Sequence, residues 1–397
     1  MYLNREEERM LDGEFGEGVA KCMKLLVTLG ELFEAKEMVK IRSSHVSGVS
    51  YKNIGDPGLE LIESFAEENV KVKVKTTLNP MGMDRERWKE MGLERSFAEK
   101  QLRIVKAYEK MGVISTCTCT PYLVGNNPKF GEHVAWAETS ATVYANSVLG
   151  AKTNRESGLS AFASAVTGRT PYYGYHLEEN RKPTVHVKLK FKPKDSLEFS
   201  VLGYLVGKNF PNSVPFISGL HEASLDELKT LGAGLASAGA ITLYHVEKLT
   251  PESRFFQDED VKNCEKFSVG QEDIRKTISE ISEEEFDCVF LGCPHCSLEQ
   301  LENVADFLRG KKVNCRLWVF TSKQVFEKAK KLGYIDIIES AGGLVLSDTC
   351  MIVSPFEKLN ITKVVTDSCK AAYYLPSTVG VKVKLENPRK ILEEITV

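Results

Sequence analysis

Five cysteines fall in three short segments whose residue types suit metal binding. The segments are Cys117-Thr118-Cys119, Cys293-Pro294-His295-Cys296 and Ser347-Asp348-Thr349-Cys350. Each follows a stretch with the pattern of a buried strand, so each is predicted to be a loop at the end of a sheet. Thiolates favour zinc, copper(I) and iron–sulfur clusters. Dispersed thiolates that converge at sheet ends could therefore hold a cluster.

Two other interpretations of these cysteines stay open on spacing alone. A zinc ribbon is disfavoured, because it needs two C-x-x-C pairs about 15–20 residues apart. Cys293 and Cys296 form one such pair, so a thioredoxin-like redox site is an alternative, although the rest of that fold is missing from the pattern. The other interpretation is that these cysteines only pack against neighbouring side chains and bind no metal. Four cysteines in helix-like or strand-like stretches are predicted to be small buried residues: Cys22, Cys264, Cys288 and Cys315.

Alternating strands and helices are predicted to position the three loops. Near the N-terminus, Asn4 is expected to cap a first helix. Further helices and strands are predicted at 18–40 (helix), 70–77 (strand), 94–111 (helix) and 113–116 (strand). Alternation over 286–291, 298–309, 315–320, 322–332 and 335–338 predicts a parallel sheet of βαβ units, with 335–338 as its last strand. We expect a multi-domain α/β protein with parallel sheets flanked by helices, divided into units at 1–280 and 281–397.

Composition excludes some classes of function. The chain has 397 residues, 42% hydrophobic, and a net charge of only −3, which argues against a nucleic-acid partner. The N-terminus lacks the apolar run of a secretory signal, and no stretch approaches the roughly 18 apolar residues of a membrane span. We therefore expect a cytoplasmic protein with no membrane partner.

Several longer strings resemble one known family, aconitase X, a branch of the aconitase superfamily. They are Thr118-Cys119-Thr120-Pro121-Tyr122, the segment 131–141 (GEHVAWAETSA), the segment 144–156 (YANSVLGAKTNRE), Gly292-Cys293-Pro294-His295 and Asp348-Thr349-Cys350. The resemblance runs from about Gly48 to Tyr374, and the combination of motifs is specific although each alone is weak.

The resemblance implies a cofactor and a partner. It places an iron–sulfur cluster, expected to be [4Fe–4S], on Cys119, Cys293 and Cys350, and leaves Cys117 and Cys296 as neighbours without an assigned role. Such a cluster acts as a Lewis acid on a substrate hydroxyl. Family members also use a swivelling domain that closes over the cluster. We expect it on a separate chain, a small subunit that forms a heterodimer with this one and carries the catalytic base.

The resemblance also implies substrate-binding residues, for each of which a purely structural role is the alternative. They are Gly48, Val49, Ser50, Asn79, Pro80, Glu138, Thr139 and Lys370. The first five could be ordinary turns, and Lys370 an ordinary surface lysine. A buried carboxylate without a partner is costly, which favours a site role for Glu138. Arg155 and Arg169 could each clamp an anion or form a salt bridge.

The activity implied is dehydration of a small hydroxy acid. Members of the split, archaeal type act on (R)-5-phosphomevalonate, forming trans-anhydromevalonate 5-phosphate for isoprenoid synthesis, and this is the substrate that we favour. Bacterial relatives dehydrate cis-3-hydroxy-L-proline, which is the alternative. A third possibility, of another class, is a cluster-bearing regulator or carrier without catalysis; the absence of a basic aromatic stripe argues against an RNA-binding version.

Overall fold

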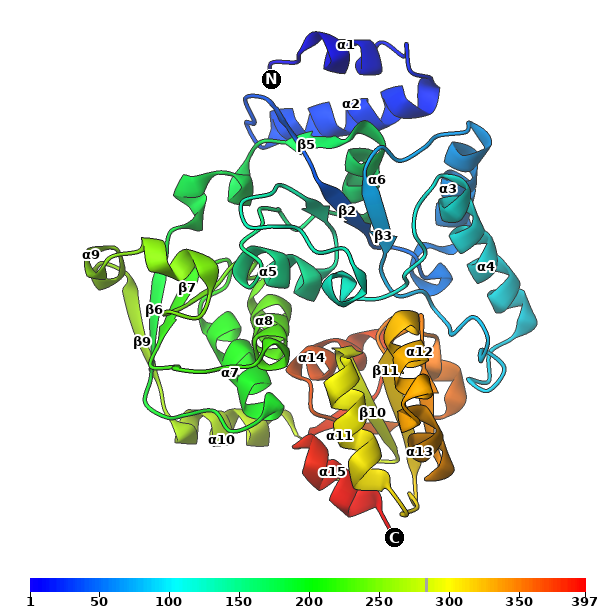
Figure 1. Ribbon diagram of the computed structural model, residues 1–397, viewed down its shortest axis with the longest axis vertical. Coiled ribbons are helices and arrows are strands. Elements are labelled where there is room, and N and C mark those ends of the chain that lie inside the picture. Colours follow the sequence, from blue (N-terminus) through cyan, green and yellow to red (C-terminus); the bar gives the residue numbers. More distant parts are fainter. Residues whose placement is uncertain (283–284) are drawn as a thin grey trace.

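The computed structural model describes residues 1–282 and 285–397, with side-chain surroundings for all of these except 258, 357 and 358. Within this part of the chain, the strands form three parallel sheets and one small antiparallel ribbon, with helices packed against the sheets (Figure 1). This confirms the predicted multi-domain α/β fold. The proposed boundary at residues 280 and 281 falls at the end of helix α10 (Gln271–Ile281).

The first sheet has the strand order β3-β2-β4. Its strands and helices are β2 (Ser43–Val46), β3 (Lys75–Leu78), β4 (Ala135–Trp136), α2 (Glu17–Leu32), α3 (Tyr51–Glu67), α4 (Arg95–Lys110), α5 (Thr139–Ser147) and α6 (Gly158–Thr167). Helix α1 (Arg5–Leu11) packs on α2, and Asn4 caps it as predicted. The ribbon of β1 (Met38–Lys40) and β5 (Arg169–Pro171) lies beside α2.

Three predicted elements of this region are wrong in extent. The helix predicted to reach residue 40 ends at Leu32, because the chain turns and residues 38–40 pair with β5. The strand predicted over 70–77 is regular only from Lys75, since Val72 and Lys73 bond to a helix end and to α6 instead of a strand. Residues 113–116 contribute one isolated bridge, from Ile114 to Thr77.

The second sheet has the order β8-β7-β6-β9, and two closely packed helices connect it to the centre of the molecule. Its elements are β6 (Val185–Leu189), β7 (Pro215–Ser218), β8 (His245–Val246), β9 (Glu265–Val269), α7 (Ser196–Asn209), α8 (Leu225–Gly239), α9 (Asp258–Lys262) and α10. Glycine is required where α7 meets α8, because a Cβ at Gly203 would lie 2.2 Å from the carbonyl oxygen of Leu231. Helix α8 in turn contacts α5 and α14 (Cys369–Thr378).

The third sheet has the order β12-β11-β10-β13-β14, all parallel, as the alternating pattern predicted. Its elements are β10 (Cys288–Cys296), β11 (Arg316–Thr321), β12 (Gly343–Leu346), β13 (Lys363–Thr366), β14 (Lys382–Leu385), α11 (Leu298–Leu308), α12 (Lys323–Lys331), α13 (Tyr334–Ser340), α14 and α15 (Pro388–Ile395). Every residue of the central strand β10 is buried, as expected of a parallel strand covered on both faces. The predicted strand at 335–338 is wrong: these residues lie in α13, whose Ile335 and Ile338 are buried at helical spacing.

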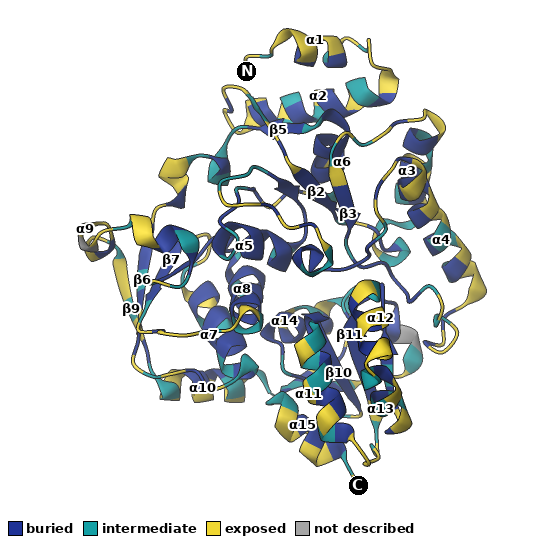
Figure 2. Ribbon diagram, viewed as in Figure 1, coloured by how far each residue is buried: buried dark blue, intermediate teal, exposed yellow. Residues whose placement is uncertain are grey.

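The burial pattern places the core where the three sheets approach one another. Figure 2 shows buried ribbon along most strands, α5 and α8, whereas β9 and the outer faces of α4, α10 and α13 are largely exposed. Short 3-10 helices connect several elements: η1 (Pro121–Val124), η2 (Gly174–His176), η3 (Glu178–Arg181), η4 (Pro251–Phe255) and η5 (Phe356–Leu359). A search of the described residues finds no helix with the length and apolar character needed to cross a bilayer.

Candidate functional site

Of the three cysteine segments, the one with Cys350 follows a complete strand, as its sequence context predicts; Cys117 and Cys119 follow an isolated bridge, and Cys293 and Cys296 lie within the last residues of β10. The segment with Cys119 leads from the Ile114 bridge into η1, and Cys350 follows β12. Cys293 lies in a bulge of β10, where residues 292–295 stand opposite a single residue of β11. Only glycine fits at 292, because its φ is +98° and a Cβ would lie 2.2 Å from the carbonyl oxygen of Phe320.

Most of the predicted site residues line one cavity of about 250 Å³. From the prediction these are Cys119, Cys293, Cys350, Asn79, Pro80, Glu138, Thr139 and Lys370. They come from the first and third sheets and from the N-termini of α5 and α14. The other residues of the lining, which were not predicted as site residues, are Ser47, Ala137, Gly292, Ile352, Val353 and Tyr374. The cavity therefore combines thiols with charged and amide side chains.

The loop of Gly48, Val49 and Ser50 lies beside this cavity and is not part of its described lining. The Ser50 hydroxyl donates to the Val353 carbonyl at 2.8 Å, and the Val49 carbonyl accepts from the Gln101 amide at 2.9 Å. These contacts hold the loop to its neighbours. Its role in substrate binding stays a prediction.

The three thiols of the cavity suit an iron–sulfur cluster better than a single ion. Burial raises the pKa of Cys119, Cys293 and Cys350 to about 12 each, so thiolates form only when a metal replaces the proton. In the described part of the chain, no three His, Cys, Asp or Glu side chains converge on one ion position. A mononuclear zinc site needs that convergence, whereas each thiolate of a cluster binds its own iron.

The neighbouring cysteines have different surroundings. The Cys117 thiol accepts from the Arg85 guanidinium at 3.2 Å and lies outside the cavity. Cys296 lines a different cavity, described below. Of the four cysteines predicted to be buried, Cys22 and Cys288 are, whereas Cys264 and Cys315 are only half-buried. Cys369 is buried at the start of α14, where its backbone N–H donates to the Ser200 hydroxyl at 2.8 Å.

His295 connects the three cysteine segments. It lies between Cys293 and Cys296, and its backbone N–H donates to the Cys119 thiol at 3.2 Å. Its ring is fully buried, with Nδ1 at 2.9 Å from the Thr118 hydroxyl and Nε2 at 2.7 Å from the Thr349 carbonyl. Burial lowers the pKa of His295 to about 4, so the ring is neutral and Nε2 is the donor to the carbonyl. This residue fixes the loops relative to one another.

A buried ion pair lines the same cavity as the thiols. The Lys370 ammonium contacts the Glu138 carboxylate and lies 3.0 Å from the Ser140 hydroxyl. Glu138 caps α5, accepting from the Ser140 hydroxyl at 2.7 Å and from the Ala141 N–H at 2.5 Å. Burial by itself raises the pKa of Glu138, but the Lys370 charge and these hydrogen bonds outweigh it and hold the pKa below its usual value. The carboxylate is therefore ionised.

The lysine is held in its charged form by the same neighbours. Burial lowers the pKa of Lys370, and the Glu138 carboxylate, followed by Cys293 and Cys119, more than compensates and raises it. An ammonium has three N–H donors, and within the described residues Lys370 uses two, to Glu138 and Ser140. The third is available to an anionic ligand in the cavity.

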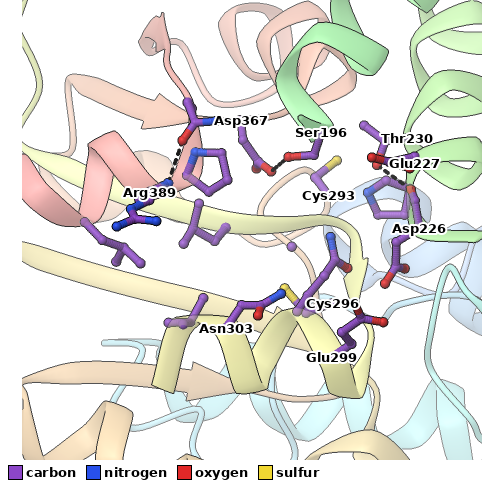
Figure 3. Close-up of a pocket in the computed structure, with 18 of the residues that line it drawn as sticks. Ser196, Asp226, Glu227, Thr230, Cys293, Cys296, Glu299, Asn303, Asp367 and Arg389 are labelled. Carbon is purple, nitrogen blue, oxygen red and sulfur yellow. Dashed lines mark hydrogen bonds between the residues drawn. The ribbon is translucent and has the colours of Figure 1, made fainter. Parts of the chain in front are cut away.

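A larger cavity, of about 610 Å³, lies between the second and third sheets (Figure 3). It shares Gly292 and Cys293 with the smaller one and is otherwise lined by α8, α11 and the start of α15, with Asp226, Glu299 and Asp367 among its residues. Of the three predicted cluster ligands, only Cys293 lines this larger cavity, and neither Lys370 nor Glu138 does. The smaller cavity is therefore the candidate site despite its size.

Two arginines considered as anion clamps lie elsewhere. Arg169 is buried against the N-terminal helix, where its guanidinium bonds Glu6 at 2.6 Å and Glu7 at 2.8 Å. Arg155 is exposed. Neither lines the candidate site, so the salt-bridge interpretation holds for Arg169.

Comparison with known proteins gives consistent matches along the whole chain. Three family models match in order: Aconitase X first domain at residues 1–179, second domain at 183–279 and third domain at 286–396. The phosphomevalonate dehydratase large subunit of Methanocaldococcus jannaschii is 51% identical, over 95% of this chain and 96% of that protein. The cis-3-hydroxy-L-proline dehydratase of Pseudomonas aeruginosa is 30% identical, over 96% of this chain but 68% of its own length.

A solved structure agrees with these matches. The holo-form of Thermococcus kodakaraensis aconitase X superposes with a TM-score of 0.93 and 42% identity, covering all of both chains.

Proposed function

Because the chain belongs to the aconitase X family, we propose that it is the large subunit of a hydro-lyase that dehydrates (R)-5-phosphomevalonate. The product is trans-anhydromevalonate 5-phosphate. One observation carries the proposal: a single cavity brings together three buried thiols and a lysine with a free N–H donor. Thiols that can hold a Lewis-acidic cluster, in one cavity with a cation that can bind an anionic group, suit the removal of hydroxide from an anionic hydroxy acid.

We assign Cys119, Cys293 and Cys350 as ligands of an iron–sulfur cluster, expected to be [4Fe–4S]. When bound there, the cluster supplies a Lewis acid that makes the substrate hydroxyl a better leaving group. The His295 contacts to the three loops keep the thiols in place before and after cluster binding. The Cys119 thiol itself accepts the His295 backbone N–H, a hydrogen bond that also stabilises a thiolate.

We assign the Lys370–Glu138 pair to the anionic groups of the substrate. Lys370 offers its third N–H to a carboxylate or phosphate oxygen, and Glu138 holds the ammonium in place. Asn79, Pro80 and Thr139 complete this side of the cavity. Gly48, Val49 and Ser50 adjoin it through Ser47 and remain candidates for the far end of the substrate.

Elimination also needs a base for the carbon-bound proton. The carboxylate of Glu138 is engaged by three donors and therefore poorly placed to take it. We expect the base on a small subunit that closes the cavity. The name "large subunit" of the Methanocaldococcus relative supports such a partner.

Length and identity favour the phosphorylated substrate over hydroxyproline. The relative named for phosphomevalonate matches end to end, whereas the hydroxyproline dehydratase is less similar and a third of it lies outside the match.

The test is anaerobic reconstitution of the chain with iron, sulfide and the small subunit, followed by assay of water loss from both acids in parallel. Turnover of 5-phosphomevalonate alone is the expected result. Turnover of cis-3-hydroxyproline alone would keep the mechanism and replace the substrate. A stable cluster with neither activity would instead support the regulator or carrier function.

A further inference from the structure

Within the described residues, two buried polar atoms beside the candidate site make no hydrogen bond of normal geometry. They are Nε2 of His45 and the amide oxygen Oδ1 of Asn79. His45 lies on β2 and is fully buried, and Asn79 directly follows β3, the neighbouring strand, and lines the cavity. The strands pair in register, with His45 beside Thr77, and the Asn79 N–H donates to the Val46 carbonyl at 2.9 Å. Leaving two such atoms unpaired costs about 1–3 kcal/mol each, so the pair calls for an explanation.

The other ring nitrogen of His45 fixes the tautomer. Nδ1 lies 2.8 Å from the Thr77 hydroxyl, which itself accepts from the Asn126 amide at 2.9 Å. The hydroxyl proton of Thr77 has one other acceptor within reach, the Ser44 carbonyl at 3.4 Å, so its best acceptor is Nδ1. Nδ1 then carries no proton. Burial lowers the pKa of His45 to about 4, hence the ring is neutral and its single proton is on Nε2.

An N–H at Nε2 also decides which way the Asn79 amide points. The Asn79 side chain is close enough to the His45 ring to raise its pKa against the effect of burial, as are the backbone groups of Thr77 and Thr118. A donor at Nε2 is complementary to the amide oxygen and would oppose the amide NH₂. The nitrogen of Asn79 must therefore be the end that points away from His45, on the side of the cavity that Asn79 lines.

We infer that His45 is a positioning residue that orients Asn79, so that the Asn79 amide nitrogen donates a hydrogen bond to an oxygen of the bound hydroxy acid. This inference rests on the proposed function for the identity of the acid. On ligand binding, the contact between Nε2–H and Oδ1 shortens into a hydrogen bond, and both orphaned atoms become satisfied. His45 itself touches no substrate.

The experiment compares the KM and kcat of the reconstituted complex for variants of both residues. His45→Phe keeps the ring shape and removes the donor, and we expect KM to rise about tenfold, as for loss of one buried hydrogen bond. We expect kcat to stay within about threefold and the cluster absorbance and iron content to match the wild type. Asn79→Ala should raise KM at least as much, and the double variant should be no worse than Asn79→Ala alone.

Two further variants keep the inference testable if His45→Phe fails to fold. His45→Gln restores a donor and should recover most of the lost affinity. Asn79→Asp keeps the acceptor that faces His45 and replaces the donor that faces the substrate, so it should fold normally and still bind substrate poorly. His245, an equally buried histidine on β8 whose Nε2 bonds the Arg181 carbonyl, serves as the control: His245→Phe should leave KM unchanged.

An unchanged KM in folded His45→Phe, or additive effects in the double variant, would overturn the inference. So would loss of the cluster in His45→Phe, because the residue would then act on the metal side. If the wild type uses cis-3-hydroxyproline instead of 5-phosphomevalonate, the proposed function fails alone, and the same KM comparison is made with that acid. If the wild type turns over neither acid, the Kd of each acid is measured for the wild type and the variants instead. If the wild type binds neither acid, both the proposed function and this inference are overturned.

Discussion

Two buried ion pairs, in different regions of the molecule, show how a structural charge differs from a functional one. Arg181, at the junction of the first and second sheets, donates hydrogen bonds from all five of its N–H groups to protein acceptors. Its acceptors are the Glu252 carboxylate, the side chain and carbonyl of Asn146, and the carbonyls of Ala151 and Tyr175. Lys370 faces the cavity and, within the described residues, leaves one donor unused.

The carboxylates differ in the same way. Burial raises the pKa of Glu252, and Arg181 only partly opposes the rise. Glu138 has a lowered pKa because Lys370, a helix N-terminus and a hydroxyl all stabilise its charge. A saturated pair fixes two elements together. In the Lys370–Glu138 pair, the carboxylate is stabilised as an anion and the ammonium keeps one N–H donor for a ligand.

The largest expected effect comes from the thiols that line the same cavity as that cation. Cys293→Ser removes one ligand of the cluster while leaving both ion pairs intact, so activity should be abolished and the visible absorbance of the reconstituted protein lost. Far-UV circular dichroism should stay close to that of the wild type, because the substitution is nearly isosteric. A fully active Cys293→Ser enzyme would contradict the ligand assignment.

Removing the free donor should come next. The double variant Lys370→Met with Glu138→Gln eliminates the buried charges together, so no unpaired carboxylate is left to destabilise the fold. We expect kcat/KM to fall by about two orders of magnitude, the size typical of losing one member of a buried charged contact. Steady-state kinetics on samples with matched iron content provide the measurement, and wild-type affinity would refute an anion-binding role.

Disrupting the Arg181–Glu252 pair should lower stability and leave substrate binding unchanged, the opposite of what we expect for the Lys370–Glu138 pair. Glu252→Gln leaves Arg181 buried without its counter-charge and should lower the free energy of unfolding by about 3–5 kcal/mol, as for other broken buried pairs. Chemical denaturation measures this loss. The KM of the folded fraction should not change, and a shifted KM would erase the distinction between the two pairs.

A smaller effect should appear in the dependence of stability on pH. The pKa of Glu138 lies below its ordinary value of 4.5 in the folded chain, so its stabilising contribution is present above that value and is lost as pH falls through the folded pKa. Glu138→Gln should therefore weaken the acid-induced loss of stability below pH 4.5. Equal acid sensitivity in wild type and variant would show that Glu138 is not stabilised as an anion.

The smallest effect is expected far from both pairs. Cys264 is half-buried beside the second sheet, and its thiol bonds only backbone carbonyls, at 3.2 and 3.3 Å. Cys264→Ser should leave iron content, activity and the thermal midpoint nearly unchanged. It is the matched control for Cys293→Ser, and loss of the cluster in this variant would mean that any cysteine substitution disturbs reconstitution.

Most residues that line the candidate site could be singled out from the sequence because they lie in short motifs that resemble those of the family. Cys119, Cys293, Cys350 and Lys370 each belong to a short string at the end of a strand or the start of a helix, and the parallel sheets bring such ends together. The same reasoning placed Asn79 and Pro80 correctly in the cavity lining. The alternating C-terminal pattern predicted a parallel sheet and two of its strands, β10 and β11, but not β12, β13 or β14.

The features of the site that could not be predicted depend on contacts between segments that are far apart in the sequence. No local signal shows that His295 bonds Thr118 and Thr349, or that Lys370 reaches Glu138, since these partners are separated by more than 50 positions. His45 could have been noticed as a polar residue in a short buried strand, but its tautomer depends on Thr77 and Asn126. The strand expected at 335–338 failed for another reason: a four-residue apolar run does not distinguish a strand from a buried helix turn.

The most direct test is an anaerobic structure of the reconstituted heterodimer with 5-phosphomevalonate bound. The account predicts iron anomalous signal at Cys119, Cys293 and Cys350, and the substrate in the 250 Å³ cavity with an anionic oxygen within hydrogen-bonding distance of the Lys370 ammonium. Substrate bound instead in the larger cavity between α8, α11 and α15, or iron held by Cys296 in place of Cys293, would contradict it.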